Sequence, residues 1–235
     1  MQRLRLLLPG LRRRDLLLKA ALAAALAAAS PFLVGTAGCS DGTDPPPGPD
    51  GGTGCDLDYL GDPEQPMVIE PVYMAPDESV VPLADGDVLP LVFPPQGGRV
   101  IFIGVRATNL LPCGVKLIGA ARDLVTGQVR FDARTMNFVA GADGKAGSIA
   151  GDLATFSNVP ICPNQWASVD AFDQTFGIEL ELQDRDGKKG EVMLQAKLAC
   201  AEPANEEGCK CICKEGYTTD EICNEPAADG GVDGG

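Results

Sequence analysis

Apolar and polar side chains alternate with a period of two in the second half of this chain. Phe176, Ile178, Leu180 and Leu182 alternate with glycine, glutamate and glutamine. After the turn-forming stretch 184–190, the alternation resumes and continues to Cys200. Side chains on a strand point alternately to opposite faces, so this pattern predicts a β-hairpin with one buried face.

Further strand patterns lie upstream. The stretch 100–107 is almost continuously apolar, which predicts a central strand covered on both faces, and 115–120 and 129–133 predict two more strands. The prolines between 66 and 90 restrict the stretch 67–93 to short or edge strands. No long amphipathic helix is expected. The sequence therefore predicts an all-β fold, an antiparallel β-sandwich over residues 55–203 that resembles the immunoglobulin-like or fibronectin-like class in pattern.

The N-terminal segment has the features of an export signal. Six basic residues precede the alanine-rich run 20–29, and Ala37 and Gly38 lead into Cys39. This segment resembles the signal of bacterial lipoproteins, which implies removal of residues 1–38 and acylation of Cys39. Arg13 and Arg14, with the apolar residues after them, also resemble the twin-arginine export motif. The alternative is an uncleaved membrane helix, but proline and glycine residues interrupt it.

The composition of the remaining segments suggests tethers and an acidic surface. Residues 39–54 and 224–235 are rich in Pro, Gly and Asp and predict a lipid-anchored disordered linker and a disordered tail.

Without residues 1–38 the chain carries 13 basic and 32 acidic residues, a net charge of −19. Such a surface repels phosphates, so no nucleic-acid partner is expected. Ser40 after the acceptor cysteine favours the outer membrane by resemblance to known lipoproteins.

Eight cysteines follow Cys39, an even number in a chain expected to be exported, so disulfides are the first interpretation. The candidates are Cys55, Cys113, Cys162, Cys200, Cys209, Cys211, Cys213 and Cys223. We expect the last four to pair mostly with each other and the first four to tie the sandwich or its ends. Cys200, on the inward face of the last strand, suits a core or inter-sheet bridge.

A Cys-rich segment, 204–223, follows the sandwich. Cys211, Cys213, Gly216, Tyr217 and Cys223 have the spacing of the closing half of an epidermal-growth-factor-like module. This resemblance implies a Cys213–Cys223 disulfide. The alternative is a zinc site of four cysteines, since four thiolates suit tetrahedral zinc.

The chain contains no histidine, which excludes Ser-His-Asp and Cys-His catalysis and histidine-ligated metals. A pair of carboxylates such as Glu179 and Glu181 remains possible for glycan hydrolysis, although a solvated sheet face is the simpler explanation. Asp184, Asp186 and Glu191 partly resemble a calcium loop, but the same residues suit a hairpin turn. We therefore expect no cofactor and no resident metal.

These features together favour a non-enzymatic lipoprotein of the bacterial cell envelope that presents a β-sandwich to an envelope protein or glycan. Two alternatives remain open. One is a carbohydrate-binding or carboxylate-based glycan-active protein, with Trp166 and Tyr73 among its aromatic contacts, and the other is a passive structural component. Cys39 is the one residue with a defined chemical role, lipid attachment.

Overall fold

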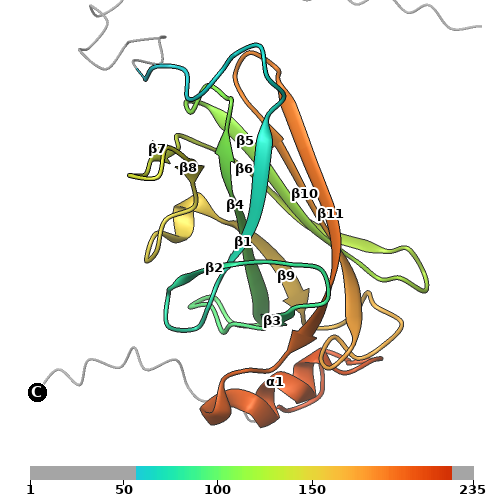
Figure 1. The fold of residues 1–235 in the computed structure, drawn as a ribbon. Helices are drawn as coiled ribbons and strands as arrows, with labels where there is room; N and C mark the ends of the chain where they lie inside the picture. The colour runs from blue at the N-terminus through green and yellow to red at the C-terminus, as the bar shows by residue number, and fades with distance from the viewer. Residues whose placement is uncertain (1–56, 224–235) are drawn as a thin grey trace, which may run out of the picture. The chain divides into compact units, whose positions relative to one another are not determined.

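The computed structural model describes residues 57–223, and within them the expected all-β architecture is confirmed. Two sheets face each other across a shared apolar core (Figure 1). The first sheet has the order β2-β1-β4-β8-β7, and β9 also pairs with β4. The second has the order β3-β11-β10-β5-β6. All pairs are antiparallel except β3 with β11, so the second sheet is mixed and not purely antiparallel as predicted.

The strands of the first sheet are β1 (Val68–Met74), β2 (Val80–Pro82), β4 (Arg99–Thr108), β7 (Val139–Ala140), β8 (Ala146–Gly147) and β9 (Ser157–Cys162). Those of the second are β3 (Val88–Pro90), β5 (Val115–Arg122), β6 (Val129–Met136), β10 (Thr175–Gln183) and β11 (Lys189–Ala199). The helical elements are the 3₁₀ turns η1 (Leu153–Thr155) and η2 (Pro203–Asn205) and the helix α1 (Glu206–Cys213).

Strand β4 is covered on both faces, as its apolar sequence predicts. Ile101, Ile103 and Val105 point into the main core between the sheets. Val100 and Phe102 point the other way, into a second apolar cluster that Phe156 completes from the chain after η1. Burying such a side chain contributes about 1.5–3 kcal/mol, so a strand with two buried faces needs a nearly continuous apolar sequence.

The predicted hairpin is confirmed as β10 and β11, with Ile178 opposite Leu194 and Leu180 opposite Val192. Its four alternating apolar residues on β10 are all buried. Glu179 and Glu181 lie on the opposite, outward face, where they pair with Arg122 and Lys189.

Strand β1 differs from its prediction, because it lies inside its sheet, between β2 and β4. Pro71 is tolerated there because β2 pairs only with Val72, Tyr73 and Met74. The carbonyl of Pro71 accepts a hydrogen bond from Leu83, just beyond β2. The backbone nitrogen and carbonyl of a strand residue point to the same neighbouring strand, so the nitrogen of Pro71 faces the side of β2. Pro71 lies one residue beyond the last paired residue of β1 and β2, so no hydrogen bond inside that pair of strands is lost.

Helix α1 was not predicted. It lies across the end of the sandwich where β3 and β11 finish (Figure 1). Cys209, Ile212 and Cys213 of α1 are buried in the main core. Within residues 57–223, no helix has the length and hydrophobicity needed to cross a bilayer.

Candidate binding groove

An open groove of about 580 Å³ lies beside α1, and we call it the terminal groove. One wall is the loop after β9 and the other is the chain that follows α1. Its lining consists of Gln128, Asn164, Gln165, Trp166, Ala167, Glu215, Gly216, Tyr217, Thr218 and Thr219.

Disulfides fix both walls of the terminal groove. Cys162 at the start of one wall is bonded to Cys213 at the start of the other. Cys211–Cys223 closes the loop that contains residues 215–219. Cys200–Cys209 attaches α1 to the end of β11. The walls are therefore joined covalently at their base, which reduces the conformational entropy that a ligand has to remove on binding.

The C-terminal end of α1 is capped by the opposite wall. The last carbonyls of a helix have no partner within the helix and must find one elsewhere. Here the carbonyl of Ile212 accepts from the Asn164 amide N–H at 2.8 Å, and that of Cys213 accepts from the Ala171 amide N–H at 2.7 Å. The Asn164 side chain donates to the carbonyls of Val169 and Cys213. These bonds explain why a short helix is stable at this position.

Trp166 forms the floor of the terminal groove. Its ring is almost fully buried and packs against Phe176, with the ring centroids 5.6 Å apart. Its indole nitrogen donates to the carbonyl of Ile161 at 2.8 Å, so the polar atom of the ring is satisfied.

Asp123 anchors the same loop to the β5–β6 turn. Its buried carboxylate accepts hydrogen bonds from the backbone of Ser168 at 2.7 Å and Val125 at 2.8 Å, and from the Thr126 hydroxyl at 2.9 Å. Burial alone raises the pKa of Asp123, but the hydrogen bonds together outweigh it and hold the pKa well below its ordinary value. The loop thus depends on a carboxylate that stays ionised.

The rim of the terminal groove is polar and available. The side chains of Gln128, Gln165 and Thr219 are exposed, and they make no hydrogen bond to any residue within 57–223. The phenol ring of Tyr217 is half-buried beside them. The lining includes the carboxylate of Glu215 but no Lys or Arg. Such a surface offers amide, hydroxyl and aromatic contacts and does not favour anions.

Two other hollows on the surface are weaker candidates for a ligand site, because their charged side chains are already paired with each other or with neighbouring residues. A hollow of about 370 Å³ on the outer face of the second sheet contains the Arg122–Glu179 ion pair, at 2.5 Å. Another of about 270 Å³ contains Arg106 and Lys145, which pair with Asp143 and Glu70. The terminal groove is therefore the better candidate for a ligand.

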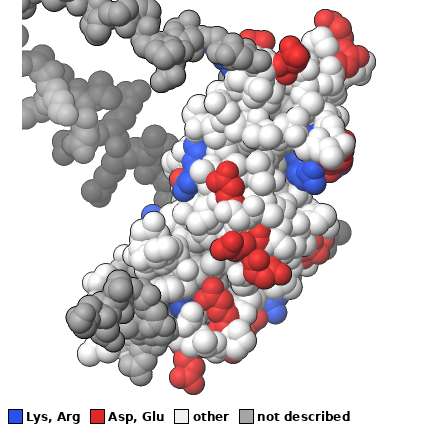
Figure 2. Space-filling view, turned by 90° about the vertical axis from the view of Figure 1, so that its left-hand side faces the viewer, with Lys and Arg blue, Asp and Glu red and all other residues white. Residues whose placement is uncertain are grey.

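Acidic residues are distributed along the surface. Figure 2 shows the face on the left-hand side of Figure 1, where Asp and Glu lie along the whole visible length and Lys and Arg are fewer. This distribution matches the acidic composition of the chain, and this face shows no concentrated basic patch.

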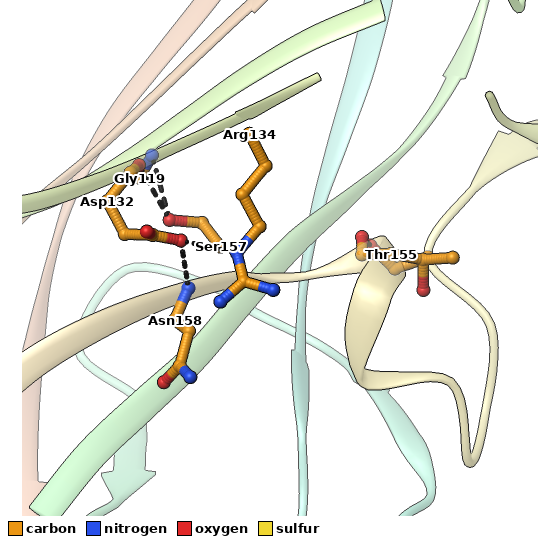
Figure 3. A network of polar contacts seen from close by, with 7 residues as sticks. Gly119, Asp132, Arg134, Thr155, Ser157 and Asn158 are labelled. Carbon is orange, nitrogen blue, oxygen red and sulfur yellow. Dashed lines mark hydrogen bonds and ion pairs between the residues drawn. The ribbon is translucent and has the colours of Figure 1, made fainter. Parts of the chain in front are cut away.

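A partly buried polar network joins the two sheets where β9 approaches β6 (Figure 3). The Ser157 hydroxyl accepts from the Gly119 amide at 3.1 Å and donates to the carbonyl of Asp132 at 3.0 Å. The Asp132 carboxylate accepts from the Asn158 amide at 2.8 Å and from Arg134 at 2.7 Å. Because the Ser157 proton is held by a backbone carbonyl, this hydroxyl acts as a structural link between the sheets.

Close approach at this network requires a glycine on β5. A Cβ on Gly119 would lie 2.5 Å from the Ser157 hydroxyl and 2.8 Å from Ile103 Cδ1. Gly104 on β4 has the same role toward Ser148, whose hydroxyl accepts from Val105 and donates to the carbonyl of Thr155. Both glycines thus mark positions where a serine side chain closely approaches a strand.

The cysteine pairing corrects two expectations. Cys223 is bonded to Cys211 and not to Cys213, and a helix occupies the stretch that resembles a growth-factor module. Among the last four cysteines only this pair is internal, because Cys209 and Cys213 bond to Cys200 and Cys162.

Cys200 follows β11 and bonds to α1, so it makes no bridge between the sheets. Cys113 is also disulfide-bonded. Cys39, Cys55, the expected signal and linker, and the tail lie outside the described residues.

The candidate calcium loop is a hairpin turn with a buried aspartate. One oxygen of Asp184 accepts from the Lys188 amide at 2.9 Å, and the other accepts from the Leu111 amide at 3.2 Å. Both oxygens of Asp184 therefore have partners from the chain itself.

No pattern in the sequence indicates that Gln128, Gln165 and Tyr217 line one groove. They lie in three segments that are far apart in the chain and meet only because the disulfides and Asp123 hold these loops at one end of the sandwich.

Neither a protein-family model nor any curated protein nor any solved structure matches this chain.

Proposed function

We propose that this chain is a non-enzymatic lipoprotein of the bacterial cell envelope, anchored through Cys39 and placed at the outer membrane. Its β-sandwich, immunoglobulin-like or fibronectin-like in pattern, serves as a binding module. One observation carries the binding role: exposed polar side chains without partners surround a groove whose two walls are joined by a disulfide. A concave site with convergent polar groups and an aromatic side chain is the usual form of a ligand site, and walls that are fixed covalently lower the entropic cost of binding.

The test is site-specific cross-linking in intact cells of the native host. A photoreactive amino acid replaces Gln165 in the terminal groove. In a matched control it replaces Asp186, which is exposed in the β10–β11 turn at the other end of the sandwich. We expect a reproducible adduct from position 165 and none from position 186. Equal adducts from both positions contradict a role for the groove, and no adduct from either favours a passive structural component.

A second candidate function is carbohydrate binding, which the half-buried ring of Tyr217 favours by lying in the groove with two glutamine side chains, whereas the Trp166 ring is almost fully buried. Aromatic rings with amide and hydroxyl groups suit an uncharged sugar. The groove lining contains one carboxylate, Glu215, whereas hydrolysis of a glycosidic bond uses two. The geometry therefore favours binding over hydrolysis. A position-165 adduct whose added mass glycosidases remove, and whose peptides all come from this chain, identifies a glycan partner.

A further inference from the structure

Four cysteine sulfurs gather at the junction between α1 and the sandwich. The Sγ atoms of Cys200, Cys209 and Cys213 all lie within 4.8 Å of one another. The fourth sulfur belongs to Cys162, which is bonded to Cys213. Two disulfides, Cys162–Cys213 and Cys200–Cys209, therefore lie side by side.

Three separate segments bring these sulfurs together. Cys162 ends β9, and Cys200 directly follows β11. Cys209 and Cys213 are four residues apart on α1, so they lie on the same face of the helix. Cys162, Cys209 and Cys213 are buried at the end of the main core, and Cys200 packs against it.

The third disulfide is separate from this cluster. Cys211 lies two residues from both Cys209 and Cys213, so it points away from their face of α1. It bonds to Cys223, beyond the groove wall. Residues 162–223 thus contain one group of four gathered sulfurs and one separate pair, which serves as an internal control.

We propose that the reduced chain binds one zinc ion through Cys162, Cys200, Cys209 and Cys213. Tetrahedral zinc has Zn–S bonds of about 2.3 Å, which separates its sulfurs by roughly 3.8 Å. The sulfurs of Cys200, Cys209 and Cys213 already lie within 4.8 Å of one another. After the two disulfides open, Cys200 has to separate from Cys209 and Cys162 from Cys213, because a disulfide bond is shorter than the spacing of sulfurs around zinc.

The disulfide-bonded state is converted into the zinc-bound state in two steps, reduction and metal binding. Two molecules of a dithiol reductant supply four electrons and four protons, which convert the two disulfides into four thiols while each dithiol becomes a cyclic disulfide. Zinc then binds the four thiolates and releases four protons. In the reverse direction two molecules of a cyclic disulfide accept the four electrons and four protons and become dithiols, while the four thiolates form the two disulfides and release Zn²⁺. The same junction is closed by a metal in reducing surroundings and by disulfides in oxidising ones.

This exchange has a consequence that rests on the proposed export route. A chain that folds before export by a twin-arginine route folds where disulfides are rare. Zinc would hold α1 against the sandwich at that stage, and the disulfides would take over after export. The zinc site itself does not depend on this route and is tested separately from it.

The test uses the full chain, reduced with a phosphine and titrated with Co²⁺ as a spectroscopic substitute for zinc. We expect the strong visible absorption of a tetrahedral cobalt–thiolate centre, saturating at one ion per chain and lost when zinc is added. Cys200→Ser with Cys213→Ser should abolish the absorption. The matched control, Cys211→Ser with Cys223→Ser, should leave it unchanged.

A second measurement needs no variant and so does not depend on how a variant folds. The reduced chain is alkylated with and without zinc, and the modified cysteines are identified by mass spectrometry. We expect zinc to protect Cys162, Cys200, Cys209 and Cys213 while Cys211 and Cys223 react. Absence of the cobalt absorption, or equal protection by zinc of the six cysteines named in this test, overturns the proposal.

Discussion

At the scale of single residues, Asp123 shows how one ionised side chain positions a loop. Its carboxylate accepts four hydrogen bonds, one of them from Ser168, 45 residues away in the chain. Asp123→Asn replaces one of these acceptor oxygens by an N–H₂ group, which cannot accept the hydrogen bonds that the carboxylate receives. We expect it to lower the free energy of unfolding at pH 7 by about 1–3 kcal/mol, because buried donors lose their partner. Urea unfolding measures this change, with the exposed Asp186→Asn as the neutral control.

The same residue predicts a pH dependence. The pKa of Asp123 is depressed in the folded state, so its contribution is fully present above the ordinary aspartate pKa of about 3.9. The contribution decreases as the pH falls below that value toward the folded pKa. The stability difference between the wild type and Asp123→Asn should therefore shrink below about pH 4. A difference that stays constant down to pH 2.5, roughly one and a half units lower, would contradict this assignment.

Gly119 gives a second prediction at this scale. In Gly119→Ala the new methyl group collides with Ser157 and Ile103, which should destabilise the protein by about 1–3 kcal/mol. Gly177→Ala, on β10 of the same sheet, is the matched control, because its Cβ meets nothing closer than 3.4 Å. Thermal unfolding compares the two variants. Similar losses from both would mean that backbone effects, and not the serine contact, determine the cost.

At the scale of elements, the disulfides should differ in what they stabilise. Cys211–Cys223 closes a loop of 12 residues, which corresponds to about 3 kcal/mol in the chain-entropy account, and Cys162–Cys213 spans 51 residues, corresponding to about 4 kcal/mol. We expect Cys211→Ser with Cys223→Ser to free the groove wall and leave the sandwich folded. Trypsin should then cut after Lys214 much faster, whereas cleavage after Lys197, which is paired on both sides in β11, should stay slow. Unchanged cleavage after Lys214 would show that Cys162–Cys213 and the non-covalent contacts are enough to hold this wall.

The elements also show what the sequence can and cannot predict. The β10–β11 hairpin was predictable because one buried face imposes a period of two, and β4 because both of its faces are buried. Helix α1 was missed because its eight residues are stabilised by disulfides and by carbonyl partners on the opposite loop, not by a local pattern. The terminal groove was missed for the same reason, since its lining comes from segments joined only by tertiary contacts. Cysteine number predicted disulfides, but only the fold decides which cysteines are close.

At the scale of the whole molecule, the proposal assigns membrane attachment to the lipid on Cys39. The chain after residue 38 has a net charge of −19, which repels anionic headgroups, so its charge does not favour attachment to an anionic membrane surface. We therefore expect Cys39→Ser to move the protein from the membrane fraction to the soluble fraction of lysed cells. Cys55→Ser is the matched control and should remain with the membrane. If Cys39→Ser still sediments with membranes after a high-salt wash, which removes electrostatic binding, a second attachment exists and the anchor proposal is incomplete.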